Sequence, residues 1–446
     1  MVANPEQDFV LKTVESRDVH FVRFWFTDVL GNMKSFAVVP GELESAFEEG
    51  MGFDASCIEG FSAAQESDML AFPDPSTFEI LPWRPQANAV ARMICDIRTP
   101  EGEPYAGDSR HVLERVVRRA AEAGYSFIVG PELEYFYFKD AEGTQVLDHG
   151  SYFDLTSLDS ASDLRRDTVL TLEKMGIPVE YSHHEKGPSQ HEIDLRYADA
   201  LSMADAVMTY KQVVKEVAMK HGVYASFMPK PMADAPGNGM HVHQSLMDRS
   251  GNNVFFDPDD PSGYNLSATA KSYIAGLLKY APEYTLVTNQ YVNSYKRLQP
   301  GGEAPTCISW GARNRSTLVR IPGYRPNSES ACRGELRSPD PACNPYLAIG
   351  LVLAAGLDGI ENRMELSAPV NRNLFIPGEA AGLDLETLPA SLEEAVEVAR
   401  NSEFLHKFLP DELSRRYYAE ALRRCEALKN ASDPAEYERV HYFNAI

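Results

Sequence analysis

Alternating hydrophobic and polar positions dominate the first hundred residues of the chain. From about Val10 to Arg98 the pattern predicts mostly short strands, two of which flank the turn signal Leu30-Gly31-Asn32. Residues 43–50 have the spacing of a short helix. A stretch rich in Pro, Gly and Asp follows at 96–110, so we expect a domain boundary near residue 104, with domains at 1–104 and 105–446.

Beyond the boundary, helical and strand patterns alternate. A long helix is predicted from about His111, and a charged helical tail from about Ser391. The predicted strands are 126–138, 191–197 and 240–246, and the helices between and after them are 162–176, 205–222 and 270–289. The most apolar run, 346–360, is shorter than the ~20 residues that a bilayer needs. We therefore predict an α+β fold in which this run is a buried helix.

Composition narrows the possible partners. The formal net charge of −23 argues against nucleic acid or an anionic membrane surface, because both require excess Lys and Arg. The first residues lack a basic start followed by an apolar run, which predicts a cytoplasmic protein without a signal peptide. The six cysteines have no CxxC spacing, and this suits reduced thiols better than zinc or disulfides.

Candidate chemistry begins in the strand "PELEYFYF", residues 131–138. Successive strand side chains point to opposite faces, so Glu132 and Glu134 share one face. A carboxylate on a strand often lies on the solvent-exposed face of a sheet. An HxH pair such as His241 and His243 is more often structural than a pair of metal ligands. Each feature alone therefore has a structural explanation.

Taken together, four segments favour metal binding. Glu185 and Glu192 occur around a second strand, the two histidines lie on a third, and a further strand aligns Arg333, Glu335 and Arg337. Five carboxylates and two imidazoles on sheet faces would require neutralising cations, and oxygen-rich sets suit Mg²⁺ or Mn²⁺ better than zinc. Residues 296–337 hold seven Arg and one Lys against three Glu. Arginines beside carboxylate-held metals indicate phosphoryl transfer around an acidic substrate.

At this point the chain resembles the glutamine synthetase family, in its bacterial type I class, over essentially its full length. The matching segments are "FDASCIEGFSAAQESDM", "GPELEYFYF", "KPMADAPGNGMHVHQSL", "NSYKRLQPGGEAP", "NRSTLVRIP" and "RGELRSPDPACNPYLA". The resemblance implies a small β-grasp N-terminal domain and a larger catalytic domain with a curved antiparallel half-barrel sheet and helices. It also implies a homododecamer of two stacked hexamers, with active sites between subunits.

The resemblance further implies a role for each motif residue. Two or more Mg²⁺ or Mn²⁺ ions would bind each active site, one held by Glu134, Glu185 and Glu192 and another by Glu132, His241 and Glu335. ATP would contact Tyr197, His243, Ser245, Arg315, Arg320 and Arg333, whereas L-glutamate would contact Gly237, Arg297 and Arg337. The amine pocket would comprise Asp54, Cys57, Tyr152 and Glu185, with Asp54 from the neighbouring subunit as the catalytic base. Arg315 would assist phosphoryl transfer, and Glu303 would close over the intermediate.

The implied activity is ATP-dependent ligation. Glutamate would be activated as γ-glutamyl phosphate, and ammonia would displace the phosphate to give glutamine. Two departures keep an organic amine open as the acceptor, namely ethanolamine, a polyamine, an alkylamine or an aniline. The family usually has "DGSS" where this chain has 54–57 as "DASC", and it commonly has Asn where Pro236 stands. Two further hypotheses are a non-catalytic relative of the family and a zinc hydrolase built on the two histidines.

Overall fold

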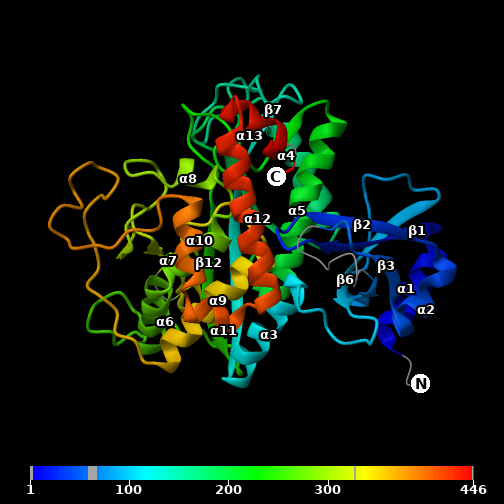
Figure 1. The fold of residues 1–446 in the computed structure, drawn as a ribbon, viewed down its shortest axis with the longest axis horizontal. Helices are drawn as coiled ribbons and strands as arrows, with labels where there is room; N and C mark the ends of the chain where they lie inside the picture. Colours follow the sequence, from blue (N-terminus) through cyan, green and yellow to red (C-terminus); the bar gives the residue numbers. More distant parts are fainter. Residues whose placement is uncertain (1–3, 59–67, 326–327, 444) are drawn as a thin grey trace.

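The computed structural model describes residues 4–58, 68–325, 328–443 and 445–446. It contains two β-sheets with helices packed on them, which confirms the α+β prediction. In Figure 1 the smaller sheet, carrying β1, β2, β3 and β6, stands to one side of the rest of the chain. Within the described ranges, every helix is too short or too polar to traverse a lipid bilayer.

The smaller sheet has the strand order β2-β1-β6-β4-β3, with β5 beside β6. Only β1 and β6 run parallel among its described pairs. Its strands are β1 (Val19–Thr27), β2 (Met33–Val38), β3 (Met51–Asp54), β4 (Asp68–Pro73), β5 (Glu79–Ile80) and β6 (Ala89–Arg98). Its helices are α1 (Pro5–Ser16) and α2 (Leu43–Glu49).

Helix α1 corrects the prediction that strands begin near Val10. The Asn4 side chain accepts a hydrogen bond from the backbone N–H of Glu6 at 3.0 Å, and Pro5 suits the first helical turn. Val10 and Val14, four residues apart, are the buried positions of the helix. A spacing of four places both valines on one helical face, whereas strand residues that share a face are two positions apart.

The larger sheet follows the order β13-β14-β15-β12-β7-β9-β8, with β10 and β11 also paired to β7. Its strands are β7 (Tyr125–Phe138), β8 (Val179–His184), β9 (Gln190–Leu195), β10 (Ala198–Asp199), β11 (Tyr224–Ser226), β12 (Met240–Asp248), β13 (Trp310–Ala312), β14 (Val319–Ile321) and β15 (Gly334–Leu336). The predicted strands at 126–138, 191–197 and 240–246 correspond to β7, β9 and β12.

The helices around this sheet are α3 (Ser109–Glu122), α4 (Ser162–Lys174), α5 (Ala200–Lys220), α6 (Ala268–Lys279), α7 (Ala281–Thr288), α8 (Ser294–Arg297), α9 (Pro345–Glu361), α10 (Leu392–Arg400), α11 (Glu403–Phe408), α12 (Asp411–Asn430) and α13 (Pro434–Tyr442). The single helix predicted at 270–289 is divided into α6 and α7, because Pro282 lacks the N–H that a continuous helix requires. The apolar run from Tyr346 is the buried helix α9, as predicted.

Alternation along β7 separates the core from the candidate site. Leu133, Tyr135 and Tyr137 point into the main hydrophobic core, which they share with residues of α3, α5 and α9. The Tyr210 hydroxyl, on α5, donates to the backbone oxygen of Leu133 at 3.2 Å. This packing fixes β7 from the helical side, so Glu132 and Glu134 project from the opposite face.

Candidate active site

The charged residues of β7, β9, β12, β14 and β15 form one continuous face of the larger sheet. Directly opposed residues on antiparallel strands project to the same side. The cross-strand partners are Glu132 with His241 and Asp194, Glu134 with Glu192, and Glu335 with His243 and Arg320. Hydrogen-bonded register therefore assembles residues that lie up to two hundred positions apart in the sequence.

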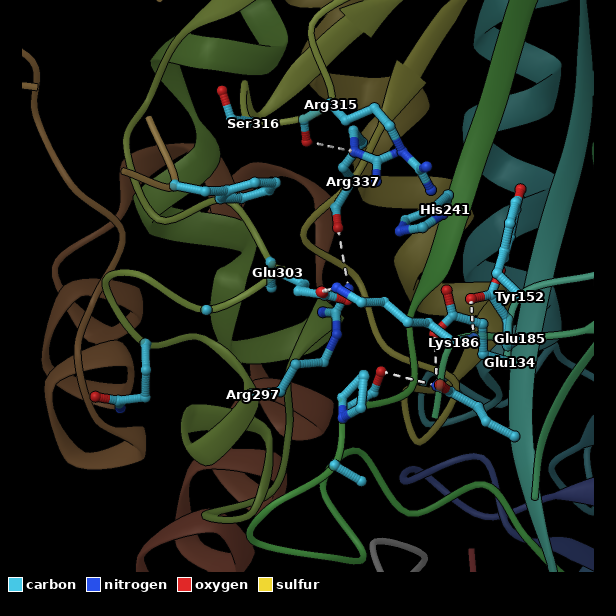
Figure 2. Close-up of a pocket in the computed structure, with 18 of the residues that line it drawn as sticks. Glu134, Tyr152, Glu185, Lys186, His241, Arg297, Glu303, Arg315, Ser316 and Arg337 are labelled. Atoms are coloured by element: carbon cyan, nitrogen blue, oxygen red, sulfur yellow. Dashed lines mark hydrogen bonds and ion pairs between the residues drawn. The ribbon is translucent and has the colours of Figure 1, made fainter. Parts of the chain in front are cut away.

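Two cavities open on this face. The larger cavity, of about 1090 Å³, is lined by predicted site residues from several segments, among them Glu134, Tyr152, Glu185, Gly237, His241, Arg297, Glu303, Arg315 and Arg337 (Figure 2). The smaller cavity, of about 350 Å³, is lined by Glu132, Tyr197, His243, Ser245 and Arg333, among others. The structure thus groups the predicted glutamate-binding residues in one cavity and most of the predicted ATP-binding residues in the other.

Glu134 is a buried carboxylate with an unusually high proton affinity. Burial, and then the negative charge of Glu185, raises the pKa of Glu134 to about 8. The backbone N–H of Gly239 partly offsets this effect, because it bonds Glu134 Oε2 at 2.8 Å. The Gln190 amide donates to the same oxygen at 3.1 Å. Burial, and then Asp194, also raises the pKa of Glu192 well above its usual range. A divalent cation between these carboxylates would restore their charged forms.

Glu132, in contrast to Glu134, is kept in its charged form by neighbouring histidines. His243 Nε2 lies 2.6 Å from Glu132 Oε1, and Arg333 Nε donates to the other ring nitrogen of His243 at 3.0 Å. Although burial opposes ionisation, the two neighbouring histidines hold the pKa of Glu132 well below its usual range. Burial, and then Arg337, lowers the pKa of His241 to about 4, so its ring is neutral at pH 7. Neutral imidazole is the form that binds metal ions.

Glu335 lies between two arginines. Its two carboxylate oxygens form ion pairs with Arg320 and Arg337. Despite nearly complete burial, the charges of His243 and Arg337 keep the pKa of Glu335 below its usual range. Arg337 Nε also donates to the backbone oxygen of Arg315 at 3.0 Å, which ties the arginine-rich segment to the acidic strands. The ion pair with Glu335 holds Arg320 next to the carboxylates, and Arg320 does not line either described cavity.

Arg297 is oriented by backbone oxygens. Its guanidinium donates to the carbonyls of Ser338 and Arg337 at 2.6 and 3.2 Å. A Cβ atom at Gly237 would lie 2.6 Å from the backbone oxygen of Pro229 and 2.9 Å from Cγ of Arg297. Only glycine therefore allows the loop to approach the arginine this closely.

Two groups of potential metal ligands lie on the site face. Each has ligand atoms within 4.8 Å of one another, and the groups are Glu132, His243 and Glu335, and His183, Glu185 and Glu192. The predicted sets share Glu132 and Glu335 with the first group, and Glu185 and Glu192 with the second. The first group contains His243 where the predicted set has His241, and the second contains His183 where the predicted set has Glu134.

A third group, Asp148, His184 and His191, has a structural explanation. The carboxylate of Asp148 already accepts hydrogen bonds from the backbone N–H groups of Gly150, Ser160 and Ser189 at 2.9–3.2 Å. It also contacts His184 Nε2 at 2.9 Å. Its acceptor positions are consequently occupied by protein donors.

Two predicted amine-pocket residues lie apart from these cavities. Asp54 ends β3 in the smaller sheet, Cys57 follows it, and both are exposed. Among the described residues, the lining of the two cavities includes neither of them. Residues 59–67 of the motif that contains them lie outside the described part of the chain.

Sequence reasoning missed three residues of the site. His183 lies 3.1 Å from Glu185 Oε1 and 3.9 Å from Glu192 Oε1. Gln190 donates to Glu134, and Lys186 forms an ion pair with Glu303. Period-two spacing was the available signal, because His183 is two positions before Glu185 and Gln190 two before Glu192. Lys186 had no comparable signal.

Comparisons with known proteins agree with this geometry. The family model "Glutamine synthetase, catalytic domain" matches residues 106–442, and "Glutamine synthetase, beta-Grasp domain" matches residues 18–100. A protein named glutamine synthetase from Mycolicibacterium smegmatis is 52% identical over 91% of this chain and 92% of its own. One from Methanosarcina mazei is 50% identical over 96% of both chains.

Solved structures show the same architecture. The structures described as "Apo GmaS without ligand" and "GmaS/ADP complex-Conformation 1" each have a TM-score of 0.87 and 31% identity, covering 97% of this chain and 98% of the other. The expected β-grasp domain and larger domain with a curled half-barrel sheet are thus confirmed. Taken together with two nearly full-length relatives, the family matches establish that this chain belongs to the glutamine synthetase family.

Proposed function

We propose that the protein is an ATP-dependent carbon–nitrogen ligase that converts L-glutamate and ammonia into L-glutamine. The observation that carries this proposal is a cavity rich in cationic side chains bordering a sheet face rich in carboxylates and histidines. The cavity is lined by Lys186, Lys230, Lys296, Arg297, Arg313, Arg315 and Arg337 against Glu134, Glu185 and Glu303. Such a site suits anionic glutamate and a transferring phosphoryl group. Relatives named glutamine synthetase, at 45–52% identity, favour ammonia over an organic amine.

We assign Mg²⁺ or Mn²⁺, two or more per site, to the acidic face. Glu134, Glu185 and Glu192 would hold one ion, and Glu132, His241 and Glu335 another. The fit rests on the raised pKa of buried Glu134 and Glu192, which a bound cation would lower again, and on the oxygen-rich donor set. When bound, the ions supply positive charge to the phosphates of ATP.

In the first chemical step, the γ-carboxylate of glutamate attacks the γ-phosphate of ATP, giving γ-glutamyl phosphate and ADP. In this assignment Arg297 and Gly237 hold the α-carboxylate and amino group of glutamate, and Arg337 holds the γ-carboxylate. Arg315 and Arg320 neutralise the transferring phosphoryl group. His243, Ser245, Tyr197 and Arg333 bind the nucleotide, consistent with their positions in the smaller cavity.

In the second step, an amine displaces the phosphate after losing a proton. We assign the amine pocket to Asp54, Cys57, Tyr152 and Glu185, with Asp54 as the base and Glu303 excluding water. Because Asp54 and Cys57 lie away from the larger cavity of their own chain, a neighbouring subunit would supply them. This arrangement fits the bacterial type I class, a homododecamer in the cytoplasm.

We also place the boundary between the N-terminal and catalytic domains near residue 104.

The test is phosphate release by purified protein supplied with ATP, Mg²⁺ and glutamate. Ammonium is compared with methylamine, ethanolamine, putrescine, spermine and aniline, and glutamine formation is measured directly. We expect strong preference for ammonium. Phosphate release with one organic amine but not with ammonium would overturn the choice of acceptor. No phosphate release with any amine would overturn the proposal that the protein is an enzyme. The matched control is Glu134→Ala, which should abolish turnover.

A further inference from the structure

Lys186 places a solvent-accessible positive charge at the predicted amine side of the larger cavity. It directly follows Glu185, and its backbone N–H donates to Glu185 Oε2 at 2.8 Å. Lys186 lines the same cavity as Tyr152, Glu185 and Glu303. The side chain is 60% exposed, so its ammonium group reaches the solvent-facing part of the cavity.

The backbone that carries Lys186 is held in a defined turn. The N–H of Gly187 donates to the Gln190 side chain at 3.0 Å, and the N–H of Gln190 donates back to the oxygen of Gly187 at 3.0 Å. The Gln190 amide also donates to Glu134 Oε2. The starting point of the lysine side chain is therefore fixed relative to the acidic face.

From this turn the lysine reaches across the cavity. Figure 2 shows Lys186 extending from the side of Glu134 and Glu185 to meet Glu303, with which it forms an ion pair. Glu303 lines the same cavity as Glu185, and its side chain is half exposed. The pairing occupies a carboxylate at this edge that would otherwise attract a second cation.

This charge has a consequence for the acceptor. An amine arrives largely as a cation, and its reactive nitrogen would lie beside Glu185. The second ammonium of a diamine would then meet the pair of Lys186 and Glu303, in which the lysine already occupies the carboxylate that could receive it. A chain of the same length without the second charge needs no such partner, because only that charge distinguishes the two molecules.

We propose that Lys186 is a specificity-determining residue that excludes acceptors carrying a second positive charge. This inference rests on the proposed function, since it concerns the amine pocket of that same ligase. The selected acceptor is ammonia or a small amine with one charge, and discrimination arises from charge rather than from size.

The experiment compares n-butylamine and putrescine, which have the same carbon chain and differ by one terminal ammonium. Both are measured in the full-length protein with ATP, Mg²⁺ and glutamate, as substrates and as inhibitors of the reaction with ammonium. For each amine we take kcat/KM as a substrate, or 1/Ki as an inhibitor, and divide the value for putrescine by the value for n-butylamine. In Lys186→Gln this ratio should rise about fivefold, which is the effect expected for one charge near the solvent surface. Lys186→Arg retains the charge and should keep the wild-type ratio.

A salt titration of the wild-type protein supplies a second readout that needs no variant. Screening should raise the same ratio as ionic strength increases, and Lys186→Gln should lose most of this dependence. The inference is overturned if Lys186→Gln has the same ratio as the wild type, or if neither amine is a substrate or an inhibitor of any variant. In both cases, activity with ammonium leaves the proposed function intact. Absence of activity with every amine, ammonium included, overturns the proposed function itself.

Discussion

Replacing Glu134 by Gln should stabilise the metal-free protein, even though it removes a proposed metal ligand. Burial and Glu185 raise the pKa of this carboxyl from 4.5 to about 8. A carboxyl with a raised folded-state pKa weakens folding as pH rises from its unfolded value toward its folded value. At pH 7 this cost is about 3 kcal/mol, from ~1.4 kcal/mol for each pH unit above 4.5. Neutral Gln removes it.

A divalent ion should cancel most of this difference in stability. The ion binds the ionised carboxylate, so saturating Mg²⁺ stabilises the wild-type protein by about 3 kcal/mol at a hundred times the dissociation constant. The variant has lost a ligand and should gain much less. The assay is thermal unfolding of both proteins from pH 5 to 8.5, in EDTA and in Mg²⁺. For a chain of this length 3 kcal/mol corresponds to ~3 °C in Tm.

The control is Glu303→Gln, which removes a carboxylate from the same cavity. Glu303 is half exposed and pairs with a lysine, so its replacement should change stability by less than about 1 kcal/mol. The reasoning fails if Glu134→Gln in EDTA is less stable than the wild type at pH 7. Equal protection of both proteins by Mg²⁺ would refute the assignment of Glu134 as a ligand.

Three further predictions concern substrate binding. Arg297→Lys loses the planar fork that the backbone carbonyls orient, so steady-state kinetics should show a 10- to 100-fold higher KM for glutamate and a nearly unchanged KM for ATP. Gly237→Ala forces a Cβ against Pro229 and Arg297, and should raise the same KM while far-UV circular dichroism stays unchanged. Arg333→Gln should instead raise the KM for ATP, because this arginine lines the smaller cavity and holds His243; an equal effect on glutamate would contradict the two-cavity assignment.

The fold was largely predictable where local periodicity was strong. Strands β7, β9 and β12 and helix α9 combine clear patterns with enough length to outweigh local ambiguity. Helix α1 was not recognised, because an N-cap and two valines four apart are weak signals beside neighbouring strands. The division between α6 and α7 depended on a single proline inside an otherwise continuous apolar pattern.

The residue types of the candidate site were predictable, but the hydrogen bonds and ion pairs between its side chains were not. Family resemblance pointed to many of the acidic and basic residues that line the two cavities. It did not reveal that Gln190 donates to Glu134, or that Lys186 meets Glu303 across more than a hundred residues of sequence. Hydrogen-bond partners of this kind depend on strand register and side-chain reach, and neither leaves a periodic trace in the chain.

Chain chemistry alone therefore indicates candidate residues: alternation places two glutamates on one face of a strand, and motif order identifies the family. The tertiary structure decides the surroundings of those residues. It sets which carboxylates share a low-dielectric space, and this raises the proton affinity of Glu134 while the histidines keep Glu132 ionised. The difference has one physical cause, because charge interactions depend on three-dimensional distance and burial rather than on separation along the sequence.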